Sequence, residues 1–258
     1  MENLKVSGPK VFFSIELPFM TVKITETVLS LLVVTLGIII AAFILTRKIT
    51  KRPSRSQVLV EKLVDMLYNV VGDTMGKHNL KFAPYIGTLF LTLLFGTLIG
   101  TTYVLRSTTA DLSVTMAFAL ITTGMVWYNN IKNFGFMTWL KGFTEPIAVM
   151  TPMNIVSEIA TPVSLAFRHF GNVAGGSVLT SMIYGALASL SSLIFGWLPG
   201  LLGEILGKIP FFQVGIPAVL SIYFDLFSGF VQAFVFILLT MIYVGAACPD
   251  PKELVKEK

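Results

Sequence analysis

Residues 162–197 read PVSLAFRHFGNVAGGSVLTSMIYGALASLSSLIFGW, and Arg168 carries the one formal charge among them. At a rise of about 1.5 Å per residue, a helix of this length reaches roughly 54 Å, whereas the hydrocarbon core of a bilayer is about 30 Å thick. A second apolar stretch, Ile216 to Ala247, reaches roughly 48 Å by the same rise. Neither stretch has a proline in its interior, so each helix either breaks at a glycine or crosses the bilayer at a strong tilt.

We favour the tilt. The two stretches then form a helical hairpin over 154–247, with its turn at Pro199–Pro217, where Glu204 and Lys208 can reach water. The length of the helices requires a tilt of about 50–60°, far above the roughly 20° of ordinary membrane helices. A tilt of that size indicates a large, curved partner that holds the hairpin.

Arg168 is the charge inside this hairpin that needs an explanation. A guanidinium cannot lose its proton, and placing it at the centre of a membrane costs about 3 kcal/mol or more. We therefore interpret Arg168 as a functional residue whose partner lies on another chain. The plainer alternative is a structural arginine that pairs within the bundle or snorkels to its edge. The other formal charges between residues 159 and 247 are Glu204, Lys208 and Asp225.

Composition indicates that the whole chain is a membrane protein. Hydrophobic residues make up 54% of its 258 residues and charged residues 13%, against about 25% charged residues in soluble domains. Basic residues cluster directly after the first apolar segment: Arg47, Lys48, Lys51, Arg52 and Arg55. This short, juxtamembrane cluster fits the positive-inside rule better than nucleic-acid binding. It predicts a cytoplasmic loop, an N-terminus outside and no nucleic-acid partner, and residues 1–24 do not resemble a cleavable signal.

The sequence predicts an all-α, polytopic membrane protein with one membrane domain over 1–258. About five helices span the membrane, and an amphipathic helix, with apolar residues at helical spacing, lies at its cytoplasmic surface. The expected segments are a first span at 26–46, the amphipathic helix at 53–80, a helix pair at 84–128, an interfacial loop at 129–152, the tilted hairpin at 154–247 and a cytoplasmic tail at 248–258.

Metal, cofactor and enzyme chemistry have few candidate residues. Cys248 is the single cysteine, and His78 and His169 are the two histidines, so neither an internal disulfide nor a metal-ligand cluster is predicted. The sequence contains no phosphate-binding glycine loop, nucleophile elbow or zinc signature. We expect no cofactor, no metal and no catalytic activity of the chain alone.

Polar residues near Arg168 form a candidate path through the membrane. At about 100° per residue, Asn172 lies one turn along the face of Arg168. On the second long helix, Asp225 and Gln232 are seven residues apart and share one face. The alternative for Gln232 is a polar clamp between helices. Two glycines also lie on the face of Arg168: Gly171 and Gly175.

His169, Ser177 and Glu158 complete the candidate set. His169 lies about 100° from Arg168, where an imidazole suits proton relay, and packing at a helix interface is an equal alternative. Ser177 lies roughly 180° round the helix from Arg168 and can face the interior of the hairpin. Glu158, at the start of the tilted helix, marks either a water-filled mouth or an acid favoured by the helix dipole.

The sequence resembles subunit a of the rotary F-type ATP synthases over about residues 25–247. Two segments carry the resemblance: Pro162-Val-Ser-Leu-Ala-Phe-Arg-His-Phe-Gly-Asn172 and Val231-Gln-Ala-Phe-Val-Phe236. Thr109-Ala-Asp-Leu112 and the helix of Glu61 after the basic loop support it. The resemblance implies a stator protein of the cell inner (plasma) membrane. Its implied partners are the c-subunit ring, the b subunits of the peripheral stalk, the rest of the synthase and membrane lipid.

The resemblance also implies a mechanism. Two aqueous half-channels lie beside the ring, and each c subunit carries one carboxylate that an ion neutralises before the ring turns through lipid. Arg168 matches the stator arginine, which favours the ionised carboxylate and blocks a direct leak. Asn172 and Gln232 match polar residues of that site. The ion is a proton or a sodium ion, a choice that depends mostly on the rotor carboxylate and its neighbours.

Three positions depart from the common pattern of the family. Many relatives have Leu where His169 stands and Glu where Ser177 stands, and several have His or a non-acidic residue at the position of Asp225. An acid is thus missing from one long helix and present on the other. We expect Asp225 to serve the half-channel that relatives serve with the missing Glu.

Two other functions remain open from the sequence. A self-contained, ion-coupled secondary transporter needs its own ion or substrate cage, but intramembrane polar groups are few and no inverted repeat is visible. A membrane scaffold for partner docking leaves Arg168 unexplained.

Overall fold

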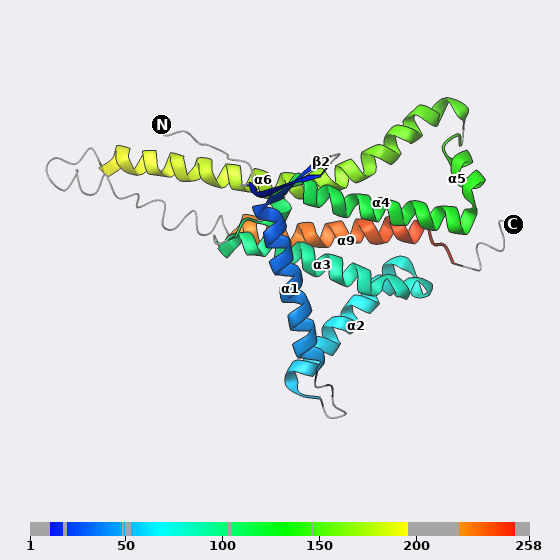
Figure 1. The fold of residues 1–258 in the computed structure, drawn as a ribbon, viewed down its shortest axis with the longest axis horizontal. Coiled ribbons are helices and arrows are strands. Elements are labelled where there is room, and N and C mark those ends of the chain that lie inside the picture. The colour runs from blue at the N-terminus through cyan, green and yellow to red at the C-terminus, as the bar shows by residue number, and fades with distance from the viewer. Residues whose placement is uncertain are drawn as a thin grey trace.

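The computed structural model describes residues 11–17, 20–47, 49, 53–102, 105–145, 147–195 and 222–250 (Figure 1). Its α-helices are α1 (Glu26–Thr46), α2 (Arg55–Met75), α3 (Ala83–Leu98), α4 (Leu112–Phe134), α5 (Phe136–Gly142), α6 (Thr151–Phe195) and α9 (Ser228–Ala246). The shorter elements are η1 (Lys77–Phe82), η2 (Ile99–Thr102), η3 (Thr108–Ala110), η4 (Ala148–Met150), the π-helical η5 (Ile222–Phe227) and the strands β1 (Val11–Leu17) and β2 (Met20–Thr25).

The chain is an all-α, multi-pass membrane protein, as the sequence predicts. Among the described residues, five helical stretches are long and apolar enough to cross a membrane: Glu26–Thr46, Lys77–Thr102, Leu112–Phe134, Ala148–Ile194 and Ser228–Ala246. One short antiparallel hairpin, β1 with β2, precedes α1 and was not predicted. Its second strand does alternate apolar Val22 and Ile24 with Lys23 and Thr25, the period-two pattern of a strand.

The helices α3, α4, α6 and α9 pack into one bundle, and α2 reaches it with its last turns (Figure 1). Small residues allow the close approaches inside it, because the Gly229 backbone lies against the Thr97 side chain and Gly245 lies against Met75. The buried apolar core joins α2, α3, α4, α6 and α9: Val71, Ile86, Leu93, Ala119, Ala166, Phe236 and Met241.

We name the two ends of the bundle after the short elements at each. The η3 end holds η3, the first turns of α1 and α4, and the beginning of α9. The α5 end holds α5, η1 and the last turn of α9, where three side chains donate to backbone carbonyls. Asn133 donates to Ala247 O at 2.8 Å, Asn79 donates to Cys248 O at 2.8 Å, and His78 Nε2 lies 2.8 Å from the same oxygen. These contacts satisfy carbonyls that a helix end leaves open.

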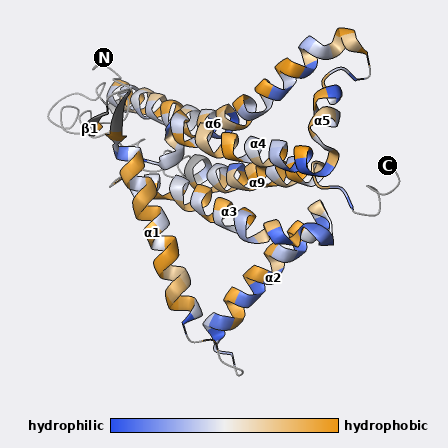
Figure 2. Cartoon of the chain, turned by 45° about the vertical axis from the view of Figure 1, so that its right-hand side comes forward, coloured by the Kyte–Doolittle hydropathy of each residue, from blue (hydrophilic) through white to orange (hydrophobic). Residues whose placement is uncertain are grey.

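The helix α1 touches the bundle only near its beginning. Thr27, Ser30 and Val34 are its buried residues, and the Thr27 hydroxyl donates to the Asp111 carboxylate at 2.7 Å. The remainder of α1 extends away from the bundle with exposed apolar side chains (Figure 2). An apolar helix without packing partners along most of its length is suited to lipid contact.

The amphipathic helix is α2, which is shorter than predicted. Ser54 caps its first turn by accepting from Gln57 N at 3.4 Å, and the helix ends at Gly76, whose φ of 82° favours glycine. A separate 3-10 helix, η1, follows it. The residues 53–80 thus contain two elements, because the turn at Gly76 interrupts the helical spacing.

The long helix α6 begins earlier than the sequence predicts and runs for 45 residues from Thr151. The predicted hairpin begins at residue 154, three residues after the observed beginning, whereas the apolar run alone begins at Pro162. Pro162 consequently lies inside the helix, where it removes a backbone hydrogen bond and bends the axis. Figure 1 shows the change of direction along α6. The predicted loop 129–152 also contains a helix, α5.

The second helix of the predicted hairpin is not α-helical throughout. Ile222–Phe227 is a π-helical turn, and regular α-helix begins at Ser228. The turn Pro199–Pro217, with Glu204 and Lys208, lies outside the described residues, as does the tail beyond residue 250.

Candidate functional site

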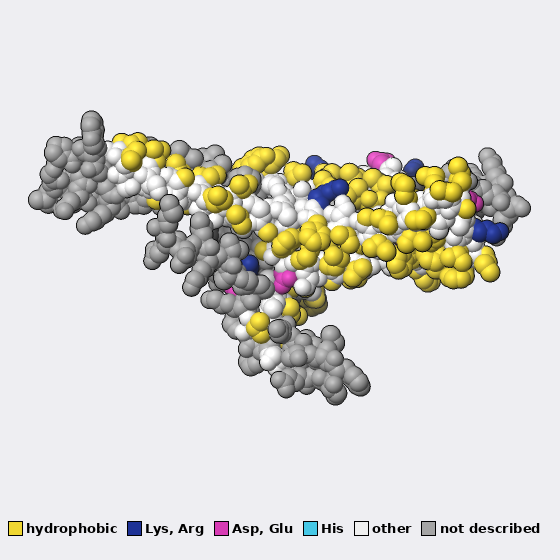
Figure 3. All heavy atoms as spheres, turned by 90° about the horizontal axis from the view of Figure 1, so that it is seen from above, with side chains coloured by type: hydrophobic (Ala, Val, Ile, Leu, Met, Phe, Trp, Pro, Cys, Tyr) yellow, Lys and Arg dark blue, Asp and Glu magenta, His cyan; other side chains and the backbone are white. Residues whose placement is uncertain are grey.

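Arg168 lies on an exposed face of α6, after the bend at Pro162. Within the part of the chain that the structure describes, its guanidinium makes no hydrogen bond or ion pair. Its neighbour Phe167 is exposed, and so is Leu179, three turns further on. The molecular face over α6 is mostly apolar in Figure 3, with few charged side chains among the described ones. A cation on such a surface needs a partner from outside the described residues.

Two glycines make this face flat, as the sequence predicts. A Cβ atom added at Gly171 or Gly175 would meet nothing within 4 Å. Glycines that face open space do not serve packing within the chain. They leave room for another helix to approach Arg168 closely.

Asn172 connects the face of Arg168 to α9. Its side-chain amide donates to Ser228 Oγ at 2.6 Å and lies 3.5 Å from Ser228 O. Gln232 lies one turn further along α9 and is half-buried. Arg168, Asn172 and Gln232 thus belong to the region where α6 and α9 cross, although the hydrogen-bond partner of Asn172 is Ser228 rather than Gln232.

His169 is buried between α6 and α9, with 1% of its surface exposed. Its ring meets the ring of Phe236 edge-on, with centroids 6.0 Å apart. Neither ring nitrogen has a hydrogen-bond partner among the described residues. The ring thus packs at the contact between α6 and α9, and a part in proton relay stays a prediction.

The contact predicted between Ser177 and Asp225 falls outside the described residues on the side of Asp225. Ser177 is exposed, and its hydroxyl donates to Ala174 O of its own helix at 2.7 Å. The side chain of Asp225 lies outside the described residues, although its backbone belongs to η5. The π-helical turn also changes the spacing between Asp225 and Gln232, so their separation is no longer two regular α-helical turns. π-helical turns are frequent at functional sites.

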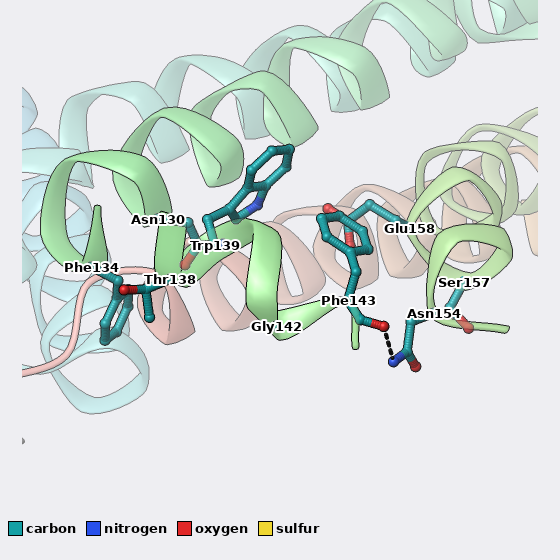
Figure 4. A pocket seen from close by; sticks show the side chains of 9 residues that line it. All are labelled: Asn130, Phe134, Thr138, Trp139, Gly142, Phe143, Asn154, Ser157 and Glu158. Carbon is teal, nitrogen blue, oxygen red and sulfur yellow. Dashed lines mark hydrogen bonds between the residues drawn. The ribbon is translucent and has the colours of Figure 1, made fainter. Parts of the chain in front are cut away.

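Glu158 lines a cavity of about 400 Å³ at the α5 end of the bundle. The Trp127 indole N–H donates to Glu158 Oε1 across α4 and α6. Figure 4 shows the side chains of this cavity, which come from α4, α5, the segment after α5 and α6. The residues that line the cavity are Asn130, Phe134, Thr138, Trp139, Gly142, Phe143, Asn154, Ser157 and Glu158.

Sequence reasoning missed two partners in these sites. Ser228 and Trp127 lie 56 and 31 residues from the side chains they bind. The sequence indicated Ser228 only weakly, because it lies three residues after Asp225 in a segment already considered as part of the candidate site. Trp127 carried no signal that pairs it with Glu158, since indole side chains at membrane interfaces are common.

The sequence profile of the ATP synthase A chain family matches residues 27–245. The "ATP synthase subunit a, sodium ion specific" of Propionigenium modestum is 31% identical over 279 residues, covering 96% of this chain and 88% of that protein. ATP synthase subunit a of Bacillus subtilis is 28% identical, covering 90% of this chain and 95% of that protein. ATP synthase subunit a 1 of Crocosphaera subtropica is 31% identical, covering 87% of each. The chain therefore belongs to the ATP synthase subunit a family.

Proposed function

We propose that this chain is the ion-translocating stator subunit of a rotary ATP synthase. It provides two half-channels for a proton or a sodium ion and the arginine that couples ion passage to rotation of a c-subunit ring. The observation that carries the proposal is Arg168, a permanent cation that is exposed and has no partner among the described residues. The flat face around it admits a helix of a neighbouring subunit.

A carboxylate on each ring subunit supplies the partner of Arg168. An opposite charge within a few ångströms favours the ionised form of a carboxyl group. Arg168 therefore promotes release of the bound ion as each ring carboxylate arrives. Because the guanidinium keeps its charge at all accessible pH values, it also repels a cation that would pass directly from one half-channel to the other.

The polar residues around Arg168 divide between the two half-channels. Asn172 and Gln232 orient water and the ring carboxylate near Arg168. Asp225 exchanges the ion with the half-channel at the side of the turn Pro199–Pro217, and Ser177 lines it. His169 holds the α6–α9 contact, and its part in proton relay stays a prediction, as does the role of Glu158 at a water-filled mouth.

Orientation follows from the distribution of basic residues. Lys77, Lys81, Lys132 and Lys141 lie at the α5 end, and Arg47 ends α1. At the η3 end, Arg106 is the basic residue of the turn before α4. We infer from the positive-inside rule that the α5 end and the C-terminus face the cytoplasm of a plasma membrane and that the N-terminus lies outside.

Exposed apolar helices provide surface for the partners. The face of α6 around Arg168 receives the c ring. The lipid-suited length of α1 and the apolar stripe of α2 contact lipid and the b subunits of the peripheral stalk. A self-contained secondary transporter would need no such partner for Arg168.

Disulfide cross-linking in the assembled synthase tests the ring-facing surface. Leu179 shares the face of Arg168 and is 50% exposed. Leu179→Cys is expected to form a disulfide with a cysteine placed on the outer helix of the c subunit. Leu36→Cys is the matched control, because Leu36 is 57% exposed on α1, away from α6. Cross-linking from Leu36→Cys in place of Leu179→Cys would contradict the proposed interface.

A further inference from the structure

The cavity at the α5 end has aromatic walls. Trp139 meets Phe143 edge-on, with ring centroids 5.1 Å apart, and Trp127 at 6.2 Å. Phe134 closes another side. At about 400 Å³ the cavity falls within the range of roughly 300–1,000 Å³ that small-molecule sites occupy. The face of an aromatic ring attracts a cation, most strongly for tryptophan.

Glu158 places one carboxylate in this aromatic cavity. The Trp127 indole N–H holds one of its oxygens in position. Among the described residues no lysine or arginine forms an ion pair with it. A half-buried carboxylate beside aromatic rings, with no cation from the described residues, is a complementary site for an external ammonium group.

The same cavity also offers donors for an anion. Asn130, Thr138 and Trp139 have side-chain N–H or O–H groups without a hydrogen-bond partner among the described residues. Asn154 differs, because its amide donates to Phe143 O at 2.9 Å and to Glu145 O at 3.0 Å and so fixes the cavity wall. Lys141, exposed on α5, lies beside the lining residue Gly142.

An ammonium site and a set of free donors within one cavity match a zwitterion. The position narrows the source of the zwitterion, because Trp127 lies two turns before the end of the span Leu112–Phe134 and Trp139 lies on the short helix that follows it. Tryptophan is common at the depth of lipid headgroups. We propose that this cavity binds the headgroup of an amine-bearing phospholipid, with its ammonium beside Glu158 and its phosphate at the donors of α4 and α5.

This role fits Glu158 better than a place in the ion path. Glu158 is ten residues from Arg168, or about 15 Å along a helix. The pocket of Glu158 lies at the α5 end of the bundle, whereas Arg168 lies after the bend at Pro162. The site is therefore independent of the ion transfer proposed for Arg168.

Lipid retention by the assembled synthase tests the site. Bilayers with equal parts of phosphatidylethanolamine and phosphatidylglycerol provide the probe, and native mass spectrometry counts the lipids that stay bound to the detergent-released complex. The wild type is expected to retain phosphatidylethanolamine in excess. Glu158→Gln should lower that excess about tenfold, a loss of about 1.4 kcal/mol for a cation that loses its counter-charge. Trp139→Leu should also lower the excess of phosphatidylethanolamine, and it provides the test if the Glu158→Gln complex does not assemble.

Glu145→Gln is the matched control, because it removes an exposed carboxylate next to the cavity without altering its lining. It should keep the wild-type lipid ratio. Equal retention of the two lipids by the wild type would overturn the proposal. So would a Glu158→Gln complex with an unchanged ratio and abolished ion pumping, because that result would assign Glu158 to the ion path. Neither result bears on Arg168, whose role is measured by pumping alone.

Discussion

The side-chain amide of Asn172 donates a hydrogen bond of 2.6 Å to the hydroxyl of Ser228, and this contact joins α6 to the first residue of α9. Asn172 lies one helical turn after Arg168, and Ser228 lies one turn before Gln232. The bond therefore fixes the rotation of one helix relative to the other at the depth of Arg168. It also follows directly upon the π-helical turn η5.

We expect a double-mutant cycle to detect this bond. Asn172→Ala and Ser228→Ala should each reduce ATP-driven ion pumping, and the double variant should be no worse than the poorer single variant. Hydrogen bonds between membrane helices contribute about 0.6 kcal/mol on average and up to roughly 1.7 kcal/mol, so the coupling energy should fall in that range. Ser189→Ala is the control, because Ser189 is exposed on α6 and its hydroxyl bonds only its own helix among the described contacts. Strictly additive losses would contradict the coupling.

Arg168→Ala should abolish ATP-driven ion pumping while the synthase still assembles. The guanidinium of Arg168 has no partner among the described residues. Loss of the guanidinium therefore removes little internal packing and leaves the ring carboxylate without a cation. Arg168→Lys should also pump poorly, because a lysine in the membrane can neutralise and lacks the planar fork. The measurement is pumping in vesicles with matched amounts of assembled complex.

The control for Arg168 is Lys62→Ala, which removes an exposed cation from α2 and should leave pumping unchanged. Normal pumping by an assembled Arg168→Ala complex would remove Arg168 from the coupling mechanism. Loss of assembly in Arg168→Ala, with Arg168→Lys assembled and fully active, would equally contradict it by pointing to a structural role.

The pattern of apolar residues was sufficient to predict the membrane spans, but not their ends. Helix α1 was predicted with its observed bounds, because an apolar run between Thr25 and Arg47 has clear polar limits. The beginning of α6 was predicted at residue 154, three residues after the observed Thr151, and the apolar run alone begins at Pro162, although the helix continues through it. A bend at proline is compatible with a helix that neighbours support.

The site was predicted in parts. The exposure of Arg168 and the open space at Gly171 agree with helical spacing, which depends on one helix alone. The burial of His169 against Phe236 depends on how α6 crosses α9, and no local pattern encodes that crossing. The π-helical geometry at Asp225 could not be predicted either, because π-helical turns have no established sequence signature.

Membrane orientation can be measured by thiol labelling from each side. Cys248 is buried, and burial raises the pKa of its thiol, so the native cysteine should label slowly. In a Cys248→Ala background, Met137→Cys on α5 should react from the cytoplasmic side, since Met137 is 71% exposed. Leu206→Cys, in the predicted turn Pro199–Pro217, should react from outside. Labelling of residue 206 from the cytoplasm alone would overturn the orientation.

Asp225 provides the test of the displaced acid. A serine at position 177 cannot exchange a proton at useful pH, whereas a carboxylate at position 225 can. We expect Asp225→Asn to slow ion pumping severely, and we expect Ser177→Glu in the same chain to restore part of it. The exposed position of Ser177 on α6 leaves room for a longer side chain there.

A structural role for Asp225 gives a different pattern in the same measurements. An asparagine can still donate and accept hydrogen bonds, so a helix clamp would survive Asp225→Asn and pumping would stay near normal. If Asp225 instead lies in the ion path, Asp225→Asn should remove its function, because the amide cannot carry the charge. Ser177→Glu alone is a useful comparison, since it adds a second acid to a working path. It should not reproduce the loss of ion pumping expected for Asp225→Asn. Near-normal pumping by Asp225→Asn at matched assembly would remove Asp225 from the ion path, whatever the double variant does.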